Sequence, residues 1–302
     1  MSHSGYYKWV AAQPVRDERE ESDREDFELV LTAYSHRGYS KGARGIYMRL
    51  LHSGVVMNVK KIRRLMKKYG LRCRLRQANP YRRMAEALKT SNVAENLVNR
   101  EFEVHGARKI LLTDITYLRR ADGKFSYLCT IIDAYTKQIL SYALSPSLEV
   151  DFVLDAVNAL MQAHQLSLTT ETLLHSDQGS HYTSHKFIDL VENSDLRRSM
   201  SRKGNCWDNA PQESFFGHMK DEIDISSCQT HDDIVRVIED WLDYYNNDRY
   251  QWELARLSPN EFYNYITTGK YPLSVTAPPI LVGIKPEKKE GRDHDHGSEE
   301  TA

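Results

Sequence analysis

The sequence predicts an α/β domain with a mixed sheet, preceded by a small all-α domain of helix-turn-helix type. Two observations predict this order. Apolar residues first recur at helical spacing and then, after residue 105, form strand-like runs. Three such runs follow one another before helices and strands begin to alternate, which is typical of a sheet with both antiparallel and parallel pairs. We divide the chain into an acidic leader (1–25), the helical domain (26–76), a polar linker (77–104), the α/β domain (105–267) and a tail (268–302) expected to be disordered toward its end.

Three short helices are expected in the helical domain. The segments DFELVLTAY and KGARGIYMRLL each repeat apolar residues at helical spacing, and Gly38 separates them. The third segment, NVKKIRRLMKKYG, begins with Asn58 as its N-cap and ends at Gly70, a typical residue just beyond a helix. Its apolar residues form a stripe along one side of the helix. The positions outside this stripe carry the cations Lys60, Lys61, Arg63, Arg64, Lys67 and Lys68.

The charge of the chain is unevenly distributed. The formal net charge is −1, yet residues 41–90 hold 15 lysines and arginines against a single acid, Glu86. The segments 17–28 and 286–302 supply compensating acidic residues. A basic block inside a neutral protein indicates binding to a polyanion such as DNA, and a solvated helix surface is the alternative explanation. The six cations of the third helix are therefore candidate DNA-binding residues.

The α/β domain is expected to start with the strands KILLTDITYLRR, KFSYLCTIIDAY and QILSYALS. A helix from about Glu149 to His164, the strand TLLHSD, a helix at HKFIDLVEN and a strand near LRRSMS follow. A helix from about His231 to Asn246 is expected to close the folded part.

Several kinds of protein are not indicated by the sequence. No apolar run reaches the roughly 18 residues of a membrane span, and the N-terminus lacks the apolar core of a signal peptide. A cytoplasmic protein without a membrane partner is expected. Cys73, Cys129, Cys206 and Cys228 have wide, irregular spacings, which favours reduced thiols over disulfides or a zinc site.

Three acids stand out from their surroundings. Asp114 interrupts an apolar strand, Asp177 ends another strand, and Glu213 lies at the start of a helix after Pro211. Each has an ordinary explanation alone, as an outward-facing strand residue, a turn former or an acid favoured by the helix dipole. Together they gain a second explanation, because neighbouring strands and a packed helix can bring all three to one sheet edge.

Three converging carboxylates favour a hard divalent cation, since like charges at close range otherwise raise one another's pKa. Oxygen ligands suit Mg²⁺ or Mn²⁺, and two such ions would support the cleavage or exchange of a phosphodiester. Lys220 follows Glu213 by seven positions and so projects from the same helix face, where a lysine is suited to hold a substrate phosphate. A surface lysine is the plain alternative for Lys220.

The segments TDITYL, HSDQGSHYTS and GNCWDNAPQESFFGHMKDE resemble the three catalytic motifs of the DDE transposases of bacterial insertion sequences. The chain is most similar to the second-frame protein of the insertion-sequence-three family, near its 150-type branch. Asp177 and Glu213 are separated by 35 residues, the spacing shared with retroviral integrases. The resemblance also covers the start SGYYKW, the helical module and the closing YYNNDRYQWELARLSPNEFY, so it spans nearly the whole chain.

The resemblance implies an RNase H-like integrase catalytic domain at 105–267 with Asp114, Asp177 and Glu213 as the catalytic, metal-binding triad for two Mg²⁺ or Mn²⁺ ions. It implies cleavage at the 3′ ends of the element and strand transfer, first between the two ends and then into target DNA. Lys220 is expected to contact DNA. The expected partners are element ends, target DNA and further copies of the chain in a synaptic complex.

Residues around the triad are assigned smaller roles. Asn205, Trp207, Asp208 and Asn209 are expected to shape the loop before Glu213, and Asp208 or Asn209 to cap its helix. Core packing is the expected role of Trp207 and of the pair Phe215 and Phe216. The residues that flank Asp177, which are His175, His181 and Tyr182, are candidates for DNA contact, with His181 in a supporting role.

Departures from the family leave other interpretations open. Ala107 and Leu111 replace a proline and a tryptophan common upstream of the first aspartate, which affects packing outside the triad. The first-frame helix-turn-helix and leucine-zipper segment is not in this sequence, so a first-frame partner or fusion is expected. The competing hypotheses are another RNase H-like nuclease, separable by a strand-transfer assay, and a catalytically inactive DNA-binding regulator, separable by a cleavage assay.

Overall fold

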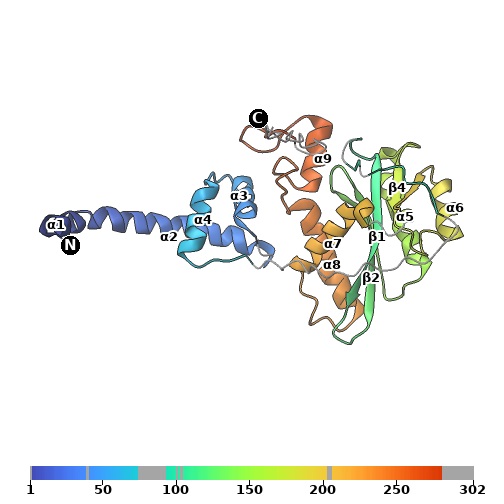
Figure 1. The fold of residues 1–302 in the computed structure, drawn as a ribbon, viewed down its shortest axis with the longest axis horizontal. Helices are drawn as coiled ribbons and strands as arrows, with labels where there is room; N and C mark the ends of the chain where they lie inside the picture. The colour runs from blue at the N-terminus through green and yellow to red at the C-terminus, as the bar shows by residue number, and fades with distance from the viewer. Residues whose placement is uncertain are drawn as a thin grey trace, which may run out of the picture.

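The structure is a computed structural model and describes residues 2–38, 41–73, 93–99, 101–102, 105–202 and 206–280. Its N-terminal part is helical, and in Figure 1 the first helix and the start of the second extend away from the rest of the molecule. The elements are α1 (His3–Ala11), α2 (Gln13–Ser35), the short 3-10 helix η1 (His36–Gly38), α3 (Ala43–His52) and α4 (Val59–Lys68).

A small apolar core joins α2, α3 and α4. Val30, Ile46, Ile62 and Leu65 are fully buried in it. The predicted ends of α4 are confirmed, because the Asn58 side chain accepts a hydrogen bond from the backbone N–H of Lys60 (2.8 Å) and Gly70 has a left-handed φ of 70°. The three predicted helices therefore form one packed domain.

A five-stranded mixed sheet forms the second domain in the described part of the chain. Its strands are β1 (Ile110–Arg119), β2 (Phe125–Asp133), β3 (Ile139–Ser145), β4 (Leu173–Ser176) and β5 (Arg197–Met200), in the order β3-β2-β1-β4-β5. β2 pairs antiparallel to both β1 and β3, whereas β4 pairs parallel to both β1 and β5. The predicted mixed sheet is confirmed.

Helices cover both faces of this sheet. Alternating residues of β1 supply two cores, because successive strand residues point to opposite faces. Leu111 packs with α5 (Val150–His164) and α6 (His185–Asn193), and Leu112 packs with α7 (Ala210–Glu222) and α8 (His231–Asn247). Figure 1 shows the two helix pairs on opposite sides of β1. The 3-10 helices η2 (Gln165–Ser167) and η3 (Cys206–Asn209) connect these elements.

Three expectations about the ends of the elements need correction. α1 was not predicted, and α2 starts at Gln13, well before the predicted first helix. The fold also continues beyond Asn246, because α9 (Pro259–Thr268) packs its fully buried Phe262 into a separate small core. Ser258 and Glu261 form a capping box at its start. The expected disorder of the tail concerns residues 281–302, which lie outside the described residues.

Part of the predicted linker packs against the sheet. The backbone N–H of Leu97 donates to the hydroxyl of Ser199 in β5 (2.9 Å), and Val98 is 1% exposed. Most of the linker, residues 74–92, lies outside the described residues.

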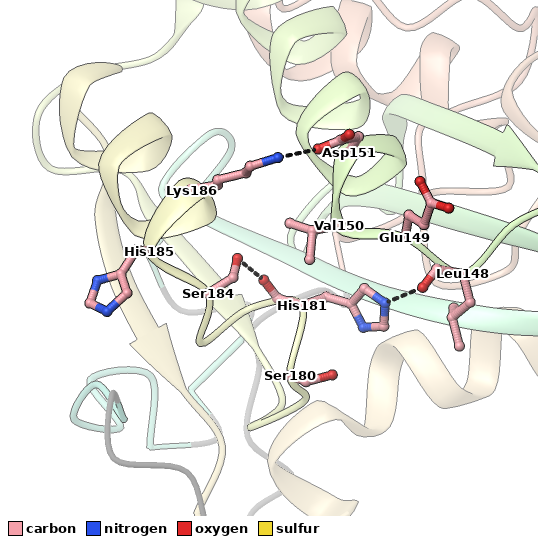
Figure 2. Close-up of a pocket in the computed structure, with 9 residues that line it drawn as sticks. All are labelled: Leu148, Glu149, Val150, Asp151, Ser180, His181, Ser184, His185 and Lys186. Carbon is pink, nitrogen blue, oxygen red and sulfur yellow. Dashed lines mark hydrogen bonds and ion pairs between the residues drawn. The ribbon is translucent and has the colours of Figure 1, made fainter.

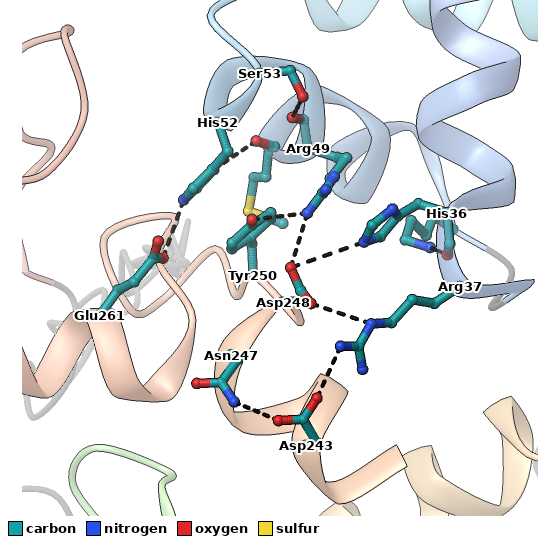
Figure 3. Close-up of polar contacts among 12 residues, drawn as sticks. His36, Arg37, Arg49, His52, Ser53, Asp243, Asn247, Asp248, Tyr250 and Glu261 are labelled. Atoms are coloured by element: carbon teal, nitrogen blue, oxygen red, sulfur yellow. Dashed lines mark hydrogen bonds and ion pairs between the residues drawn. The ribbon is translucent and has the colours of Figure 1, made fainter. Parts of the chain in front are cut away.

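The helical domain contacts the end of the second domain through polar groups (Figure 3). Arg49 of α3 donates to Asp248 (3.0 Å) and to the hydroxyl of Tyr250 (3.0 Å). His52 stacks on Tyr250 with 3.5 Å between ring centroids and bonds Glu261 (3.1 Å). One side of α3 therefore faces the second domain and is bonded to it.

Candidate active site

Asp114 lies in the middle of β1, paired with Thr130 of β2. Its Oδ1 accepts a hydrogen bond from the backbone N–H of Ile115 (2.7 Å). Burial raises the pKa of the Asp114 carboxyl to about 8, the charges of Asp177 and Glu213 add to the rise, and Lys220 opposes it. All three predicted neighbours thus lie within electrostatic reach of Asp114.

Asp177 directly follows β4 at the level of Asp114. The parallel register pairs Leu112 with His175, so two residues further along the strands the two aspartates are neighbours. Burial raises the pKa of the Asp177 carboxyl, while the N–H of Gly179, which donates to its Oδ1 (2.9 Å), and His181 lower it. The sheet therefore brings these two acids to the same place.

Glu213 lies in the first turn of α7, the helix that packs against β1. The neighbouring Gln212 is fully buried and donates its side-chain amide to the hydroxyl of Thr130, the residue paired with Asp114. This bond fixes the start of α7 beside Asp114. Among the described residues, no group of three or more His, Cys, Asp or Glu side chains has an arrangement that could hold a metal ion as it stands.

The loop before α7 is held by Asp208, one of the residues expected to shape it. Asp208 is 1% exposed and accepts from the Asn96 amide (2.9 Å) and from the Arg202 guanidinium (2.8 and 2.9 Å). The predicted side-chain cap is wrong, because Asn209 occupies the N-cap position without a side-chain hydrogen bond and Asp208 pairs with Arg202 instead. Asn205 and the side chain of Trp207 lie outside the described residues.

The phenylalanines after Glu213 belong to the core, as predicted. Phe215 and Phe216 are 3% and 5% exposed, and Phe215 packs against Trp241 and Tyr245 of α8. They hold α7 on the sheet.

The residues that flank Asp177 differ from the expectation. His175 and Tyr182 are buried, so their candidacy for DNA contact is wrong. His175 bonds the hydroxyls of Ser199 (2.9 Å) and Ser201 (3.1 Å), and burial lowers its pKa to about 4. His175 therefore ties β4, the strand that directly precedes Asp177, to Ser199 of β5.

His181 lines an open cavity of about 640 Å³ beside this strand end (Figure 2). Its Nε2 bonds the carbonyl of Leu148 (3.2 Å), and Ser184 caps α6 by accepting from the N–H of Phe187 (3.3 Å). Lys186 crosses the cavity to reach Asp151 (3.0 Å). The cavity joins the starts of α5 and α6 next to Asp177.

The six cations of α4 do not share one environment. Lys61, Arg64 and Lys68 contact acids of α2. Lys60, Arg63 and Lys67 are exposed.

No helix in the described part of the chain is long and apolar enough to cross a membrane.

Comparison with known proteins gives matches along most of the chain. The family model described as integrase core domain matches residues 105–206, a second integrase core model matches residues 194–259, and an HTH-like domain matches residues 21–79. Among solved structures, the chain resembles the catalytic core domain of BIV integrase (TM-score 0.42, 17% identity, 54% of this chain and 99% of that chain). It also resembles the catalytic domain of Mos1 mariner transposase (TM-score 0.36, 13% identity, 45% of this chain and 70% of that chain).

Sequence relatives cover the chain more completely. The 31 kDa protein of insertion element IS600 from Shigella sonnei is 32% identical over 265 residues, 87% of this chain and 94% of that protein. A transposase-like protein of Haemophilus influenzae is 31% identical over 212 residues, 69% of this chain and 94% of its own length. The transposase InsF for insertion sequence IS3A from Escherichia coli K12 is 29% identical over 268 residues, 87% of this chain and 91% of that protein. The chain therefore belongs to the insertion-sequence-three family of transposases, with an RNase H-like integrase core behind a helix-turn-helix-like domain.

Proposed function

We propose that this transposase cleaves the 3′ ends of its element and joins them to DNA at a site formed by Asp114, Asp177 and Glu213. The observation that carries the proposal is the juxtaposition of two acids on neighbouring parallel strands. Asp114 and Asp177 follow the parallel register of β1 and β4, and burial raises the pKa of both carboxyls. Two adjacent acids that are costly to ionise alone become stable carboxylates when a cation neutralises them.

The donors at this site fit Mg²⁺ or Mn²⁺. Carboxylate oxygens are the ligands that hard cations prefer, and the nearest histidines are occupied elsewhere, with His175 bonded to serines and His181 to a carbonyl. Two ions held by Asp114, Asp177 and Glu213 would supply an activated nucleophile and stabilise the leaving oxygen of the phosphodiester. Rotation of the Glu213 side chain toward the two aspartates would complete the ligand set.

The remaining side chains would position DNA. Lys220 lies two turns after Glu213 on α7, and its charge reaches Asp114, so it is suited to hold a phosphate next to the reacting bond. Asp208 would hold the loop before α7, and with it the start of the helix that carries Glu213. His181 would line the DNA path at the cavity of Figure 2.

The DNA partners would be the element ends and a target duplex. Joining two ends requires both ends to be held close to one active site, which supports a synaptic complex of several copies. A first-frame protein, as a partner or as a fusion, would add recognition of the ends. A reaction on cellular DNA would take place in the bacterial cytoplasm, which is the location we propose.

The test compares the wild type with Asp177→Asn on oligonucleotides that carry the element ends, with Mg²⁺ or Mn²⁺. We expect the wild type to cleave and join strands, and the variant to bind DNA but do neither. Asp189→Asn, which changes an exposed acid on α6, is the matched control and should retain activity. Joining by Asp177→Asn would refute the triad, and cleavage without joining by the wild type would indicate a nuclease.

A further inference from the structure

The six cations of α4 form two parallel rows on the helix surface. Lys61, Arg64 and Lys68 have the spacing i, i+3, i+7, and we call them the inner row. Lys60, Arg63 and Lys67 have the same spacing one residue earlier, and we call them the outer row. Because one residue turns the helix by about 100°, the rows face different directions, and neither coincides with the buried Ile62 and Leu65.

The inner row is bound to acids of α2. Both terminal nitrogens of Arg64 donate to Asp23 (2.6 Å each), in a bidentate geometry. Lys68 donates to Asp23 (2.7 Å) and to Glu20 (2.5 Å), and Lys61 contacts Asp26.

The ion pairs that Asp23 makes with Arg64 and Lys68 stabilise the contact between α2 and α4. The residue is 3% exposed, whereas Arg64 and Lys68 are 41% and 31% exposed at their side chains. Hydrogen bonds from Arg64, followed by those from Lys68, hold the pKa of the Asp23 carboxyl well below its usual range. If the inner row moved to a DNA phosphate, Asp23 would lose three charge-assisted hydrogen bonds that Arg64 and Lys68 donate to it.

In the described ranges, the outer row has no ion pairs comparable to those of the inner row. Lys60, Arg63 and Lys67 are exposed, and none of them has an ion pair with a residue of the described ranges. On α3, Arg49 and His52 are engaged with Asp248, Tyr250 and Glu261 (Figure 3). Arg44 of the same helix lies over the ring of Trp252.

We infer that Lys60, Arg63 and Lys67 form the phosphate-contacting face of the helical domain, and that Lys61, Arg64 and Lys68 are a structural clamp that holds α2. This assignment rests on the proposed function as a DNA-binding transposase. It divides a helix that looks uniformly basic in the sequence into a DNA face and an intramolecular face. The acids of α2 act as permanent counter-charges for the clamp.

Two charge-matched variants of the full chain test the assignment. One replaces the outer row (Lys60→Gln, Arg63→Gln, Lys67→Gln), and the other replaces the inner row (Lys61→Gln, Arg64→Gln, Lys68→Gln). Binding to duplex DNA with the element ends is measured over a range of salt concentrations, and unfolding is followed by circular dichroism.

We expect the outer-row variant to keep its unfolding midpoint, while the slope of log K against log salt becomes shallower by about 3, one unit per lost phosphate contact. The inner-row variant should unfold at a lower temperature and keep the slope of the wild type. If it fails to fold, a second version that also carries Glu20→Gln, Asp23→Asn and Asp26→Asn removes the unpaired acids and is measured instead.

The results separate this inference from the proposed function. A wild type that binds DNA without salt dependence would count against the DNA-binding role of the whole domain. A wild type that binds as expected, with equal slope changes in both variants or a larger change in the inner-row variant, would overturn only the division into rows.

Discussion

The backbone of Gly179 contacts one side-chain oxygen of Asp177 so closely that position 179 has no room for a side chain. The N–H of Gly179 donates to Oδ1 of Asp177 at 2.9 Å, and a β-carbon placed on Gly179 would lie 2.9 Å from that same oxygen. A contact this short between carbon and oxygen is repulsive, whereas the hydrogen bond is at its ordinary length. A side chain at position 179 would therefore move the carboxylate proposed to hold metal.

The first prediction concerns Gly179→Ala. We expect strand transfer to fall by up to about 100-fold, because a displacement of an ångström or less at a reacting centre can have that effect. The unfolding midpoint should change little, since the turn is exposed. Gly42→Ala, before α3, is the matched control, because a β-carbon there meets nothing within 4 Å, and it should keep full activity. Full activity of Gly179→Ala would show that Asp177 tolerates displacement.

The second prediction concerns Asp114→Asn without metal. Burial and the neighbouring acids raise the pKa of Asp114 to about 8, so the folded protein binds a proton more tightly than the unfolded chain does. The stability that depends on this group is present below the unfolded value of about 3.9 and declines as pH rises toward 8. At pH 8 we expect the metal-free Asn variant to unfold at a higher temperature than the wild type.

The same variant tests metal binding. A cation bound only by the folded state raises the unfolding temperature of the wild type. Asp114→Asn should lose most of the upward shift that millimolar MgCl₂ or MnCl₂ produces. An equal shift in both proteins, measured by thermal unfolding, would exclude Asp114 as a ligand.

The third prediction concerns acid unfolding of the helical domain. The pKa of Asp23 is lowered, so its contribution to stability is present above the unfolded value of about 3.9 and is lost as pH falls through the lower folded value. Asp23→Asn should cost about 1 kcal/mol at pH 7 and flatten the loss of stability below about pH 4. Glu25→Gln, at an exposed position of the same helix, should change neither. Urea unfolding between pH 2 and 7 gives the comparison.

The fourth prediction concerns the contact between the domains. Asp248 accepts from Arg49 (3.0 Å) and pairs with Arg37 (3.3 Å). Asp248→Asn weakens both contacts without touching either core, so the two domains should unfold in separate transitions and the radius of gyration should increase. Asp240→Asn is the control, because Asp240 is 62% exposed and 3.8 Å from Arg37. A single transition and an unchanged radius in Asp248→Asn would show that other contacts hold the domains together.

The sequence predicts those features that depend on local pattern. Apolar runs predicted β1 to β4, because strands buried on both sides need apolar residues at most positions. Asn58 and Gly70 marked the ends of α4, because caps are local hydrogen bonds. Ser258 and Glu261 carried the same kind of signal for α9, a capping box that we overlooked.

Features that join distant segments could not be predicted. Asp208 looked like a helix cap, and only the fold brings Asn96 and Arg202 to it. The acids of α2 looked like a leader, because nothing in their spacing shows that Asp23 lies under Arg64. The convergence of Asp114 and Asp177 was inferred from three motifs, and the register of two parallel strands gives it a physical basis.

The two rows of α4 have a consequence for how related elements diverge. Positions 61, 64 and 68 are tied to Asp23, Glu20 and Asp26, so a substitution in one helix should be accompanied by a compensating substitution in the other. Positions 60, 63 and 67 carry no such partner in the described ranges, so a substitution there needs no compensating change. Selection can therefore retune how strongly the domain holds DNA phosphates without disturbing its packing.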